Sequence, residues 1–352
     1  MMTKRILQNV FFQVLIVIAV HSGETSTNLD LFRSYFQAGE TVAKQFQAGD
    51  TLITGTYTQL NQNFHHAFWQ ANLRNREGLN SIRLSETVKG IEFFADNGDY
   101  YSRNEHVLVN ADPEEGMEPD PTQSTTTDRR TERYYVGGMK YVMQGLLPRD
   151  PQWGDSWSIR SRDTDTPYQT NERSLYGFAY SVYFGELRKT IDGFLKTMEE
   201  GDSTLDIQVK NDEESQQIWF CFGVQDKIKY LEMEFSTAHP EKLLTYVRYV
   251  GGQQQIQDFV KYDYNEEGQL VRVRNFNFMD KEAARTLDDC TEANATIVFE
   301  ATIETMARHQ ANPMSSTPLA LIQDGDVVGD YVKNVRYKHG KPETERPLND
   351  KG

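Results

Sequence analysis

The feature that most constrains the fold is a series of strand-like segments between Leu205 and Glu304. Apolar residues alternate with polar ones inside most segments, and glycine, asparagine or acidic clusters separate the segments. Strands at this spacing, joined by short turns, predict an antiparallel meander. The expected strands are Leu205–Lys210, Gln216–Phe222, Ile228–Phe235, Leu243–Val250, Ile256–Tyr264, Gln269–Met279 and Asn294–Glu304.

The two faces of these strands differ. In the third strand, alternate residues are apolar, which predicts that Glu232 and Glu234 on the other face are exposed. The last expected strand, Asn294–Glu304, again has a continuous apolar face. The apolar residues expected to line one concave side, and to contact any ligand held there, are Phe220, Leu231, Met233, Phe235, Ile297 and Phe299.

Bends and helices complete the predicted architecture. Between Val273 and Phe276 the apolar phase slips by one residue, which predicts a β-bulge near Asn275. Helical spacing of apolar residues predicts one helix over residues 28–48, weakened by a central glycine, and a second within residues 174–200. We therefore expect a mainly β fold in which a curved antiparallel sheet forms an incomplete barrel, with the helices on its concave side.

The remaining segments predict hairpins and loops. Asp96-Asn97-Gly98-Asp99 and Gly137-Gly138 are hairpin-turn signals, with strands expected on both sides of each. Residues 112–131 are acidic and nearly without apolar side chains, which predicts a disordered loop. Residues 148–171 are irregular, and Trp153 and Trp157 are expected to attach them to the surface.

Residues 1–23 have the pattern of a secretory signal peptide. Lys4 and Arg5 precede an apolar run from Val10 to Val20 that is too short to span a membrane comfortably. The alternative is an uncleaved N-terminal anchor. We expect an exported protein, periplasmic or extracellular, with a single domain over residues 24–338 and a flexible tail over residues 339–352.

The charge argues against a polyanionic partner. The chain carries a net charge of -15, and removal of residues 1–23 would leave 35 basic against 52 acidic residues, a net charge of -17. The richest basic cluster outside the signal, Arg129, Arg130 and Arg133, follows the acidic Asp120 and Asp128. Nucleic-acid binding requires a concentrated basic surface, so no nucleic-acid partner is expected.

The chain has two cysteines, Cys221 and Cys290. In an exported protein they could form a disulfide, but Cys221 lies in an apolar strand where a buried free thiol is equally reasonable. Sequence alone leaves both alternatives open.

No motif predicts catalysis, a cofactor or a metal. His65 and His66 would point to opposite faces of a strand, and the other histidines lack the spacing of metal ligands. Glycine-rich phosphate loops and nucleophile elbows are absent. We therefore expect a non-enzymatic protein without a cofactor, with hydrolase activity as a remote alternative.

The order of parts resembles the LolA/LolB-like periplasmic lipoprotein-carrier superfamily, in particular its larger secreted bacterial relatives. The resemblance rests on this layout and on the segments Leu175-Tyr176-Gly177-Phe178, Met233-Glu234-Phe235 and Leu243–Arg248. It implies a half-barrel whose concave apolar face binds a lipid or a lipoprotein acyl chain. The alternative function is a structural or partner-binding β protein with a filled core and no ligand.

Overall fold

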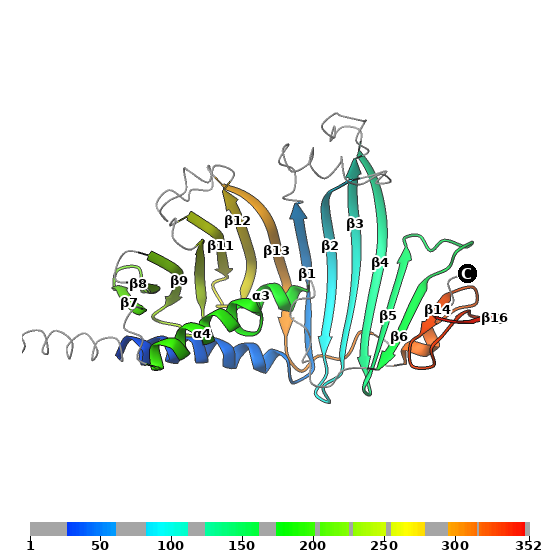
Figure 1. The fold of residues 1–352 in the computed structure, drawn as a ribbon, viewed down its shortest axis with the longest axis horizontal. Coiled ribbons are helices and arrows are strands. Elements are labelled where there is room, and N and C mark those ends of the chain that lie inside the picture. The colour runs from blue at the N-terminus through cyan, green and yellow to red at the C-terminus, as the bar shows by residue number, and fades with distance from the viewer. Residues whose placement is uncertain are drawn as a thin grey trace, which may run out of the picture. The chain divides into compact units, whose positions relative to one another are not determined.

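The computed structural model describes residues 27–60, 82–111, 124–161, 174–200, 205–224, 228–250, 255–278, 295–314 and 317–348. Strands dominate these residues, as expected (Figure 1). The strands are β1 (Thr51–Leu60), β2 (Ile82–Phe94), β3 (Tyr100–Ala111), β4 (Ser124–Val136), β5 (Met139–Leu146), β6 (Ser156–Ser161), β7 (Asp206–Asp212), β8 (Gln217–Val224), β9 (Ile228–Ser236), β10 (Leu243–Val250), β11 (Gln255–Tyr264), β12 (Leu270–Phe278), β13 (Ala295–Ala307), β14 (Val327–Asp330), β15 (Val335–Lys338) and β16 (Lys341–Pro347). A helix over residues 27–46, α3 (Leu175–Phe184), α4 (Glu186–Glu199) and the 3-10 helix η4 (Pro318–Leu321) complete the structure.

All sixteen strands belong to one hydrogen-bonded sheet, in the order β16-β15-β14-β6-β5-β4-β3-β2-β1-β13-β12-β11-β10-β9-β8-β7. β16 and β7 end this order and do not pair with each other, so the sheet is not closed. The pairs whose register is established are antiparallel except β14 with β6, which is parallel. The prediction of a mainly β fold on an open sheet is confirmed.

The chain divides into two compact units. Unit 1 contains residues 1–43, 182–262 and 276–296, and unit 2 contains residues 44–181, 263–275 and 297–352. Each unit is therefore assembled from three separate stretches of the chain.

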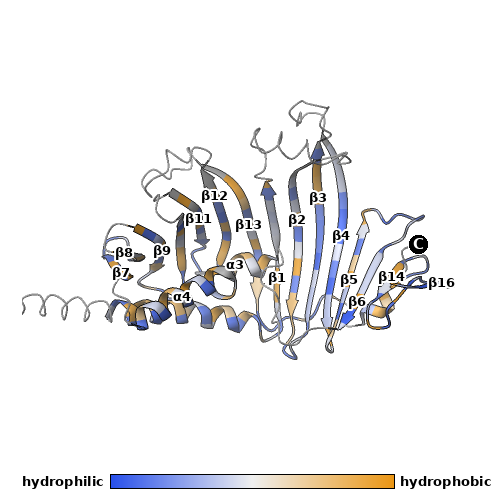
Figure 2. Cartoon of the chain, in the orientation of Figure 1, coloured by the Kyte–Doolittle hydropathy of each residue, from blue (hydrophilic) through white to orange (hydrophobic). Residues whose placement is uncertain are grey.

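Unit 1 has an aromatic core between the helix over residues 27–46 and strands β8 and β9. Hydrophobic and hydrophilic residues alternate around this helix, and its apolar side chains Phe32 and Phe36 are buried (Figure 2). Gly39, which weakens the helix intrinsically, allows the Tyr183 ring to approach closely, because any side chain at residue 39 would overlap that ring. The glycine is thus a packing requirement of this helix.

Unit 2 packs α3 against one face of the sheet. Tyr176 and Phe178 of α3 contact Phe94 and Tyr57, with ring centroids 4.9 and 5.0 Å apart. The buried carboxylate of Glu92 on β2 accepts hydrogen bonds from the first backbone N–H groups of α3, those of Leu175 and Tyr176. This satisfies two of the four donors that a helix leaves free at its start.

A separate cluster in unit 2 connects the C-terminal strands to the rest of the sheet. Trp157 on β6 stacks near Tyr134 on β4, and Val328 on β14 is buried in the same cluster. β14 adds to the sheet beside β6 through the pairs from Val327 with Ser156 to Asp330 with Ile159. The C-terminal residues are therefore an integral part of unit 2.

Both predicted hairpin turns are confirmed. β2 and β3 are joined by a turn in which Gly98 has a φ of 80°, and the Ala95 N–H donates to the Asp99 carbonyl. β4 and β5 are joined at Gly137 and Gly138, both with positive φ. Glycine adopts this left-handed conformation without the cost that a Cβ atom imposes.

Several predictions are corrected. The expected loop over residues 112–131 extends too far, because residues from Ser124 belong to β4, and β16 occupies Lys341–Pro347 of the expected flexible tail. The single predicted helix within residues 174–200 is two helices, separated at Gly185, whose backbone is extended. The stretch over residues 148–171, expected to be irregular, contains β6, in which Trp157 is buried, and the Trp153 ring is exposed instead of attaching the stretch to the surface.

The prediction that Glu232 and Glu234 are exposed is also wrong. Both side chains are buried. Glu232 pairs with Lys229 and accepts a hydrogen bond from the Tyr249 hydroxyl. Glu234 interacts with Thr245 and Lys261. Polar partners on adjacent strands make the burial of these carboxylates tolerable.

Some predictions fall outside the described residues. These are the signal peptide over residues 1–23, the placement of His65 and His66, and Cys290. Among the residues described, no helix is both long and apolar enough to cross a membrane.

Candidate functional site

Four of the six residues predicted to contact a ligand form the core of unit 1. Phe220, Leu231, Met233 and Phe235 are each 0% exposed. The helix over residues 27–46 covers this face: Phe32 meets Phe220 edge-on at 5.3 Å, and its neighbour Tyr35 contacts Phe220 and Phe235 at 5.6 and 5.7 Å. A ligand would reach this face only if that helix moved away.

The other two residues, Ile297 and Phe299, lie on β13 in unit 2 and are half-buried. Phe299 contacts Phe178 of α3 and Tyr57 of β1, with ring centroids 3.8 and 5.9 Å apart. The six predicted residues are thus divided between the two units. Their role in ligand binding remains a prediction.

Cys221 lies on β8, opposite Glu232 on β9. Burial, together with the nearby Glu232 carboxylate, raises the pKa of the Cys221 thiol to about 12. The thiol is therefore protonated and weakly reactive at neutral pH. Because its predicted partner lies outside the described residues, the disulfide also remains a prediction.

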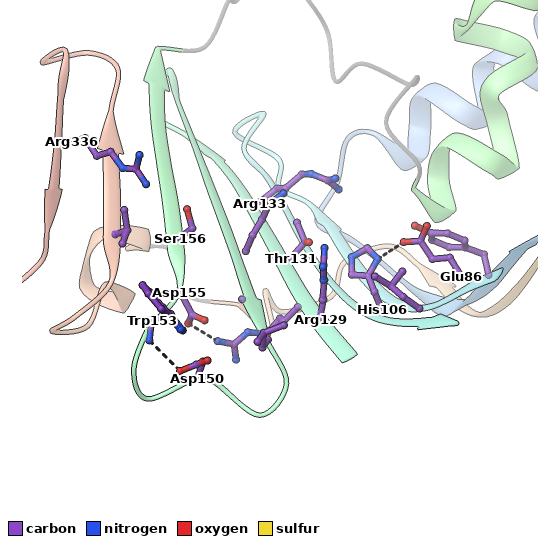
Figure 3. A pocket seen from close by; sticks show the side chains of 18 residues that line it. Glu86, His106, Arg129, Thr131, Arg133, Asp150, Trp153, Asp155, Ser156 and Arg336 are labelled. Carbon is purple, nitrogen blue, oxygen red and sulfur yellow. Dashed lines mark hydrogen bonds and ion pairs between the residues drawn. The ribbon is translucent and has the colours of Figure 1, made fainter. Parts of the chain in front are cut away.

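The described residues of unit 2 contain a pocket with a volume of about 630 Å³, within the range typical of small-molecule sites (Figure 3). His106 with Leu108 on β3, and Arg129 with Thr131 and Arg133 on β4, alternate along their strands and share one face of the sheet, whereas Arg130 lies on the other face. The lining residues of the pocket are Tyr57, Glu86, His106, Leu108, Arg129, Arg130, Thr131, Arg133, Gln144, Gly145, Leu146, Asp150, Trp153, Gly154, Asp155, Ser156, Val327 and Arg336.

One wall of the pocket carries an acid–histidine pair. The Nδ1 atom of His106 on β3 lies 2.7 Å from a carboxylate oxygen of Glu86 on β2 (Figure 3). Its other ring nitrogen, Nε2, is buried without a hydrogen-bond partner. Directly opposite His106, across the β3–β4 pair, is Arg129.

Arginines give the pocket its positive charge. Arg129, Arg130 and Arg133 come from β4, and Arg336 comes from β15. Arg130 is held by the Asp155 carboxylate at 3.2 Å. Arg129 and Arg336 are exposed and form no ion pair with any residue that the structure describes.

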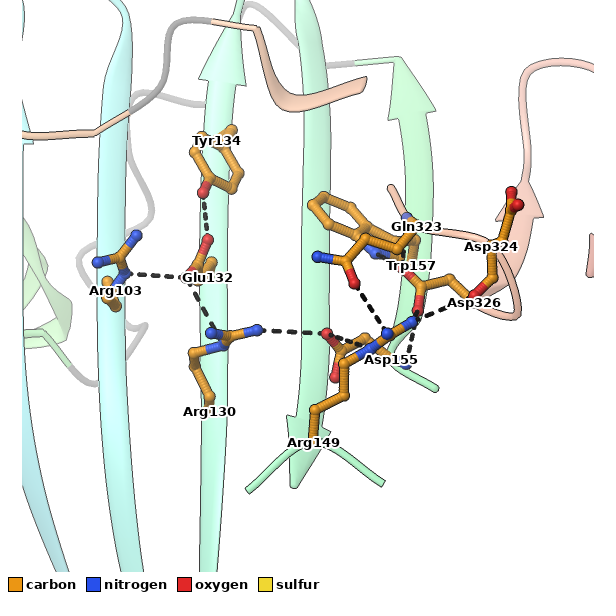
Figure 4. A network of polar contacts seen from close by, with 10 residues as sticks. All are labelled: Arg103, Arg130, Glu132, Tyr134, Arg149, Asp155, Trp157, Gln323, Asp324 and Asp326. Carbon is orange, nitrogen blue, oxygen red and sulfur yellow. Dashed lines mark hydrogen bonds and ion pairs between the residues drawn. The ribbon is translucent and has the colours of Figure 1, made fainter. Parts of the chain in front are cut away.

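Asp155 connects the pocket to a network of buried ion pairs (Figure 4). Arg149 bridges Asp155 and Asp326, and Asp326 also accepts hydrogen bonds from the Asp155 N–H at 2.8 Å and the Trp157 indole N–H at 3.0 Å. Burial raises the pKa of Asp155, with the Arg130 guanidinium opposing that rise. Gly145 is required beside it, because a Cβ atom there would overlap the Asp155 carboxylate. The network fixes the pocket wall.

A tight turn presents an aromatic ring at the pocket. The Asp150 carboxylate accepts the backbone N–H groups of Gln152 and Trp153, at 2.7 and 3.1 Å, which is the geometry of an Asx turn. The Trp153 side chain is 68% exposed. A fixed backbone thus holds a large apolar ring in solvent, where it is available to a ligand.

The pocket lining is both charged and apolar. The described residues contain no group of three metal-ligating side chains. The pocket combines cations with the apolar side chains of Tyr57, Leu108, Leu146 and Val327. The cluster of Arg129, Arg130 and Arg133 is visible in the sequence but the pocket is not, because only strand register brings Arg129 beside His106.

Comparisons with known proteins add little. No family model matches the chain, and no curated protein is significantly similar to it. A solved structure of a DUF1329 family protein from Desulfovibrio piger ATCC 29098 aligns with a TM-score of 0.29 and 9% identity, over 82% of this chain and 98% of that one. At this TM-score the likeness carries no argument, and the resemblance to the LolA/LolB-like superfamily is not shown.

Proposed function

We propose that the protein is an exported, non-enzymatic binding protein for an amphiphile of the lipid class, and that unit 2 binds this ligand in its pocket. The observation that carries the proposal is the pocket itself, which has a volume of about 630 Å³ and a lining of both cationic and apolar side chains. Export rests on the signal-like pattern of residues 1–23.

The pocket is a better place for an acyl chain than the face of Phe220 and Met233. That face is already filled by the rings of Phe32 and Tyr35, whereas Trp153 at the pocket is exposed. Each CH₂ group that leaves water contributes about 0.8 kcal/mol. A few methylene groups against Leu108, Leu146 and Trp153 would therefore give measurable affinity.

Native mass spectrometry of the purified protein, with extraction of bound lipid, tests the proposal. We expect a bound amphiphile or, after delipidation, uptake of a fluorescent fatty acid. The variant Leu146→Asp should abolish uptake, because it places a charge against the apolar part of the ligand at a pocket side chain that is 41% exposed. Leu319→Asp, a change at an exposed residue outside the pocket, is the matched control. No bound lipid and no uptake would overturn the proposal.

A second candidate is a partner-binding protein with a filled core. The fully buried aromatic face of unit 1 favours it, as does the free edge of β7 at the end of the sheet order. Exposed strand edges bind extended segments of other proteins through main-chain hydrogen bonds. This function predicts a stable complex with a protein partner and no amphiphile in either unit.

A further inference from the structure

One face of the sheet in unit 2 carries cations and no acid over the strands β4, β5, β6, β14, β15 and β16 (Figure 1). Residues paired directly across neighbouring strands have their side chains on the same face, so the register assigns this face from Arg129 onward. None of the described residues that the register places on it is acidic. The cationic face comprises Arg129, Arg133, Lys140, Arg160, Arg336, Lys338, Lys341 and Arg346.

The opposite face of the same strands is apolar and acidic. Trp157 and Val328 are buried there in the hydrophobic cluster of unit 2. Glu132 of β4 pairs with Met143, and Asp330 of β14 pairs with Ile159, so both acids lie on this opposite face. The net charge of -15 predicted no polyanionic partner, but that average conceals a separation of charge between the two faces.

The cations are not neutralised by one another's strands. Three cross-strand pairs on the cationic face join two cations: Lys140 with Arg160, Arg336 with Arg346, and Lys338 with Lys341. Like charges directly opposite each other destabilise a sheet. Arg160, Arg336 and Arg346 are exposed and form no ion pair with any residue in the described part of the chain. A negatively charged partner would relieve this repulsion.

An aromatic ring lies among these cations. A Cβ atom at Gly329, on the cationic face, would lie 3.4 Å from the Tyr331 ring, so the ring covers this glycine. Tyr331 is 50% exposed, and the Arg160 guanidinium lies 4.2 Å from its ring centroid. Leu146, which pairs with Arg129, is also exposed. Tyrosine is favoured where a membrane meets water, so these side chains favour a lipid surface over a soluble polyanion.

We propose that the cationic face docks the protein onto an anionic lipid bilayer. Attraction between exposed charges acts over a Debye length, about 10 Å at 0.1 M salt, so docking does not require each cation to touch a phosphate. Arg129, Arg133 and Arg336 of this face also line the pocket, so docking would bring the pocket to the lipid (Figure 3). The choice of a bilayer rests on the proposed function, in which the pocket binds an amphiphile of the lipid class.

Flotation with lipid vesicles tests the inference on the full chain. The vesicles consist of phosphatidylcholine, either alone or with one third phosphatidylglycerol. We expect binding only to the vesicles that contain phosphatidylglycerol, because the acidic protein has no general attraction to anions. Raising the salt from about 0.1 M to about 1 M shortens the Debye length to about 3 Å and should weaken this binding at least about tenfold.

A triple variant tests the cations themselves. Arg160→Gln with Arg336→Gln and Arg346→Gln should weaken binding to phosphatidylglycerol vesicles at least about tenfold. Without vesicles, its Tm should be unchanged or higher, because the variant removes repulsion between opposed charges. The matched control removes three exposed cations outside the face, with Lys196→Gln, Lys210→Gln and Arg308→Gln, and should weaken binding less than about twofold.

The outcomes separate docking from the proposed function. Equal binding to both kinds of vesicle, no binding to either, or equal losses in the two triple variants would overturn the docking inference. Binding of dextran sulfate through the same three arginines, without binding to vesicles, would show that the face binds a soluble polyanion instead. If the arginines support vesicle binding but no lipid is extracted or taken up, docking stands and the proposed function fails. Uptake of lipid without vesicle binding gives the reverse conclusion.

Discussion

The buried carboxyl of Glu92, at the start of α3, makes the stability of the protein depend on pH. Burial raises its pKa from 4.5 to about 7, although hydrogen bonds from the Leu175 and Tyr176 backbone and the charge of Arg133 lower it. The folded protein therefore keeps this proton to a higher pH than the unfolded chain does. The resulting stabilisation is complete below about pH 4.5 and is lost as the pH rises to about 7.

The size of this effect is about 3 kcal/mol, from a shift of about 2.5 pKa units. Glu92→Gln imitates the protonated acid. We expect it to change the slope of the unfolding free energy against pH, between pH 5 and pH 7, by the amount that one bound proton contributes. Urea unfolding at several pH values measures the slope. Glu105→Gln, at an exposed carboxyl on the adjacent strand, should leave it unchanged, and an unchanged slope in Glu92→Gln would contradict the assignment.

Cys221 should be nearly inert in the folded protein. A pKa of about 12 leaves a thiolate fraction at pH 8 roughly 10³-fold below that of an ordinary thiol, and burial restricts access further. In a Cys290→Ser variant, we expect labelling by Ellman's reagent to be at least about a hundredfold slower in buffer than in denaturant. Rapid labelling of the folded variant would show that β8 is open to solvent. Thiol counts of the unreduced wild-type chain in denaturant test the disulfide separately.

At the scale of elements, Asp326 joins the C-terminal strands to β6. Burial alone would raise its pKa, but hydrogen bonds from the backbone of Gln323 and Asp155, from Arg149 and from Trp157 lower it below the usual value. Its contribution to stability is therefore present at neutral pH and is lost as the pH falls through this lowered pKa.

We expect Asp326→Asn to destabilise the protein by about 3 kcal/mol, because it leaves the Arg149 charge without its closest partner. Thermal unfolding at pH 7 measures the loss. Asp324→Asn is the matched control, because this neighbouring aspartate is exposed and should change stability by less than about 0.5 kcal/mol. Equal effects of the two substitutions would show that the network in Figure 4 is not a source of stability.

Sequence predicted the strands from Asp206 to Ala307 well, because apolar alternation marks a sheet with buried faces. It missed the first half of β4, where Ser124 to Glu132 has no apolar residue. Those residues form a strand because β3 and, for their second part, β5 satisfy the backbone hydrogen bonds. It missed the parallel pairing of β14 with β6 because nothing local encodes contact between segments so far apart.

The same limit applied to the candidate sites. The apolar face of Leu231 and Met233 was visible in the sequence, but the aromatic helix that fills it could not be assigned to that face. The pocket collects residues from Tyr57 to Arg336, and its unpaired atoms are defined only by three-dimensional packing.

At the scale of the whole molecule, the two units are interleaved along the chain. A continuous segment of the chain that contains all of one unit also contains strands of the other unit. Export adds a testable change in mass: we expect the secreted protein to begin after about residue 23. Intact mass spectrometry measures this directly, and a full-length mass in the secreted fraction would favour the uncleaved anchor.

The parallel docking of β14 onto β6 has a consequence for self-association. β16, at the end of the sheet order, contains two prolines and four charged residues, which discourage the addition of another strand. The C-terminal strands thus cover the edge of β6 that would otherwise end the sheet. A chain ending at Met314 would expose that edge as a template for a second molecule, and light scattering should detect soluble oligomers or aggregates that the full chain does not form.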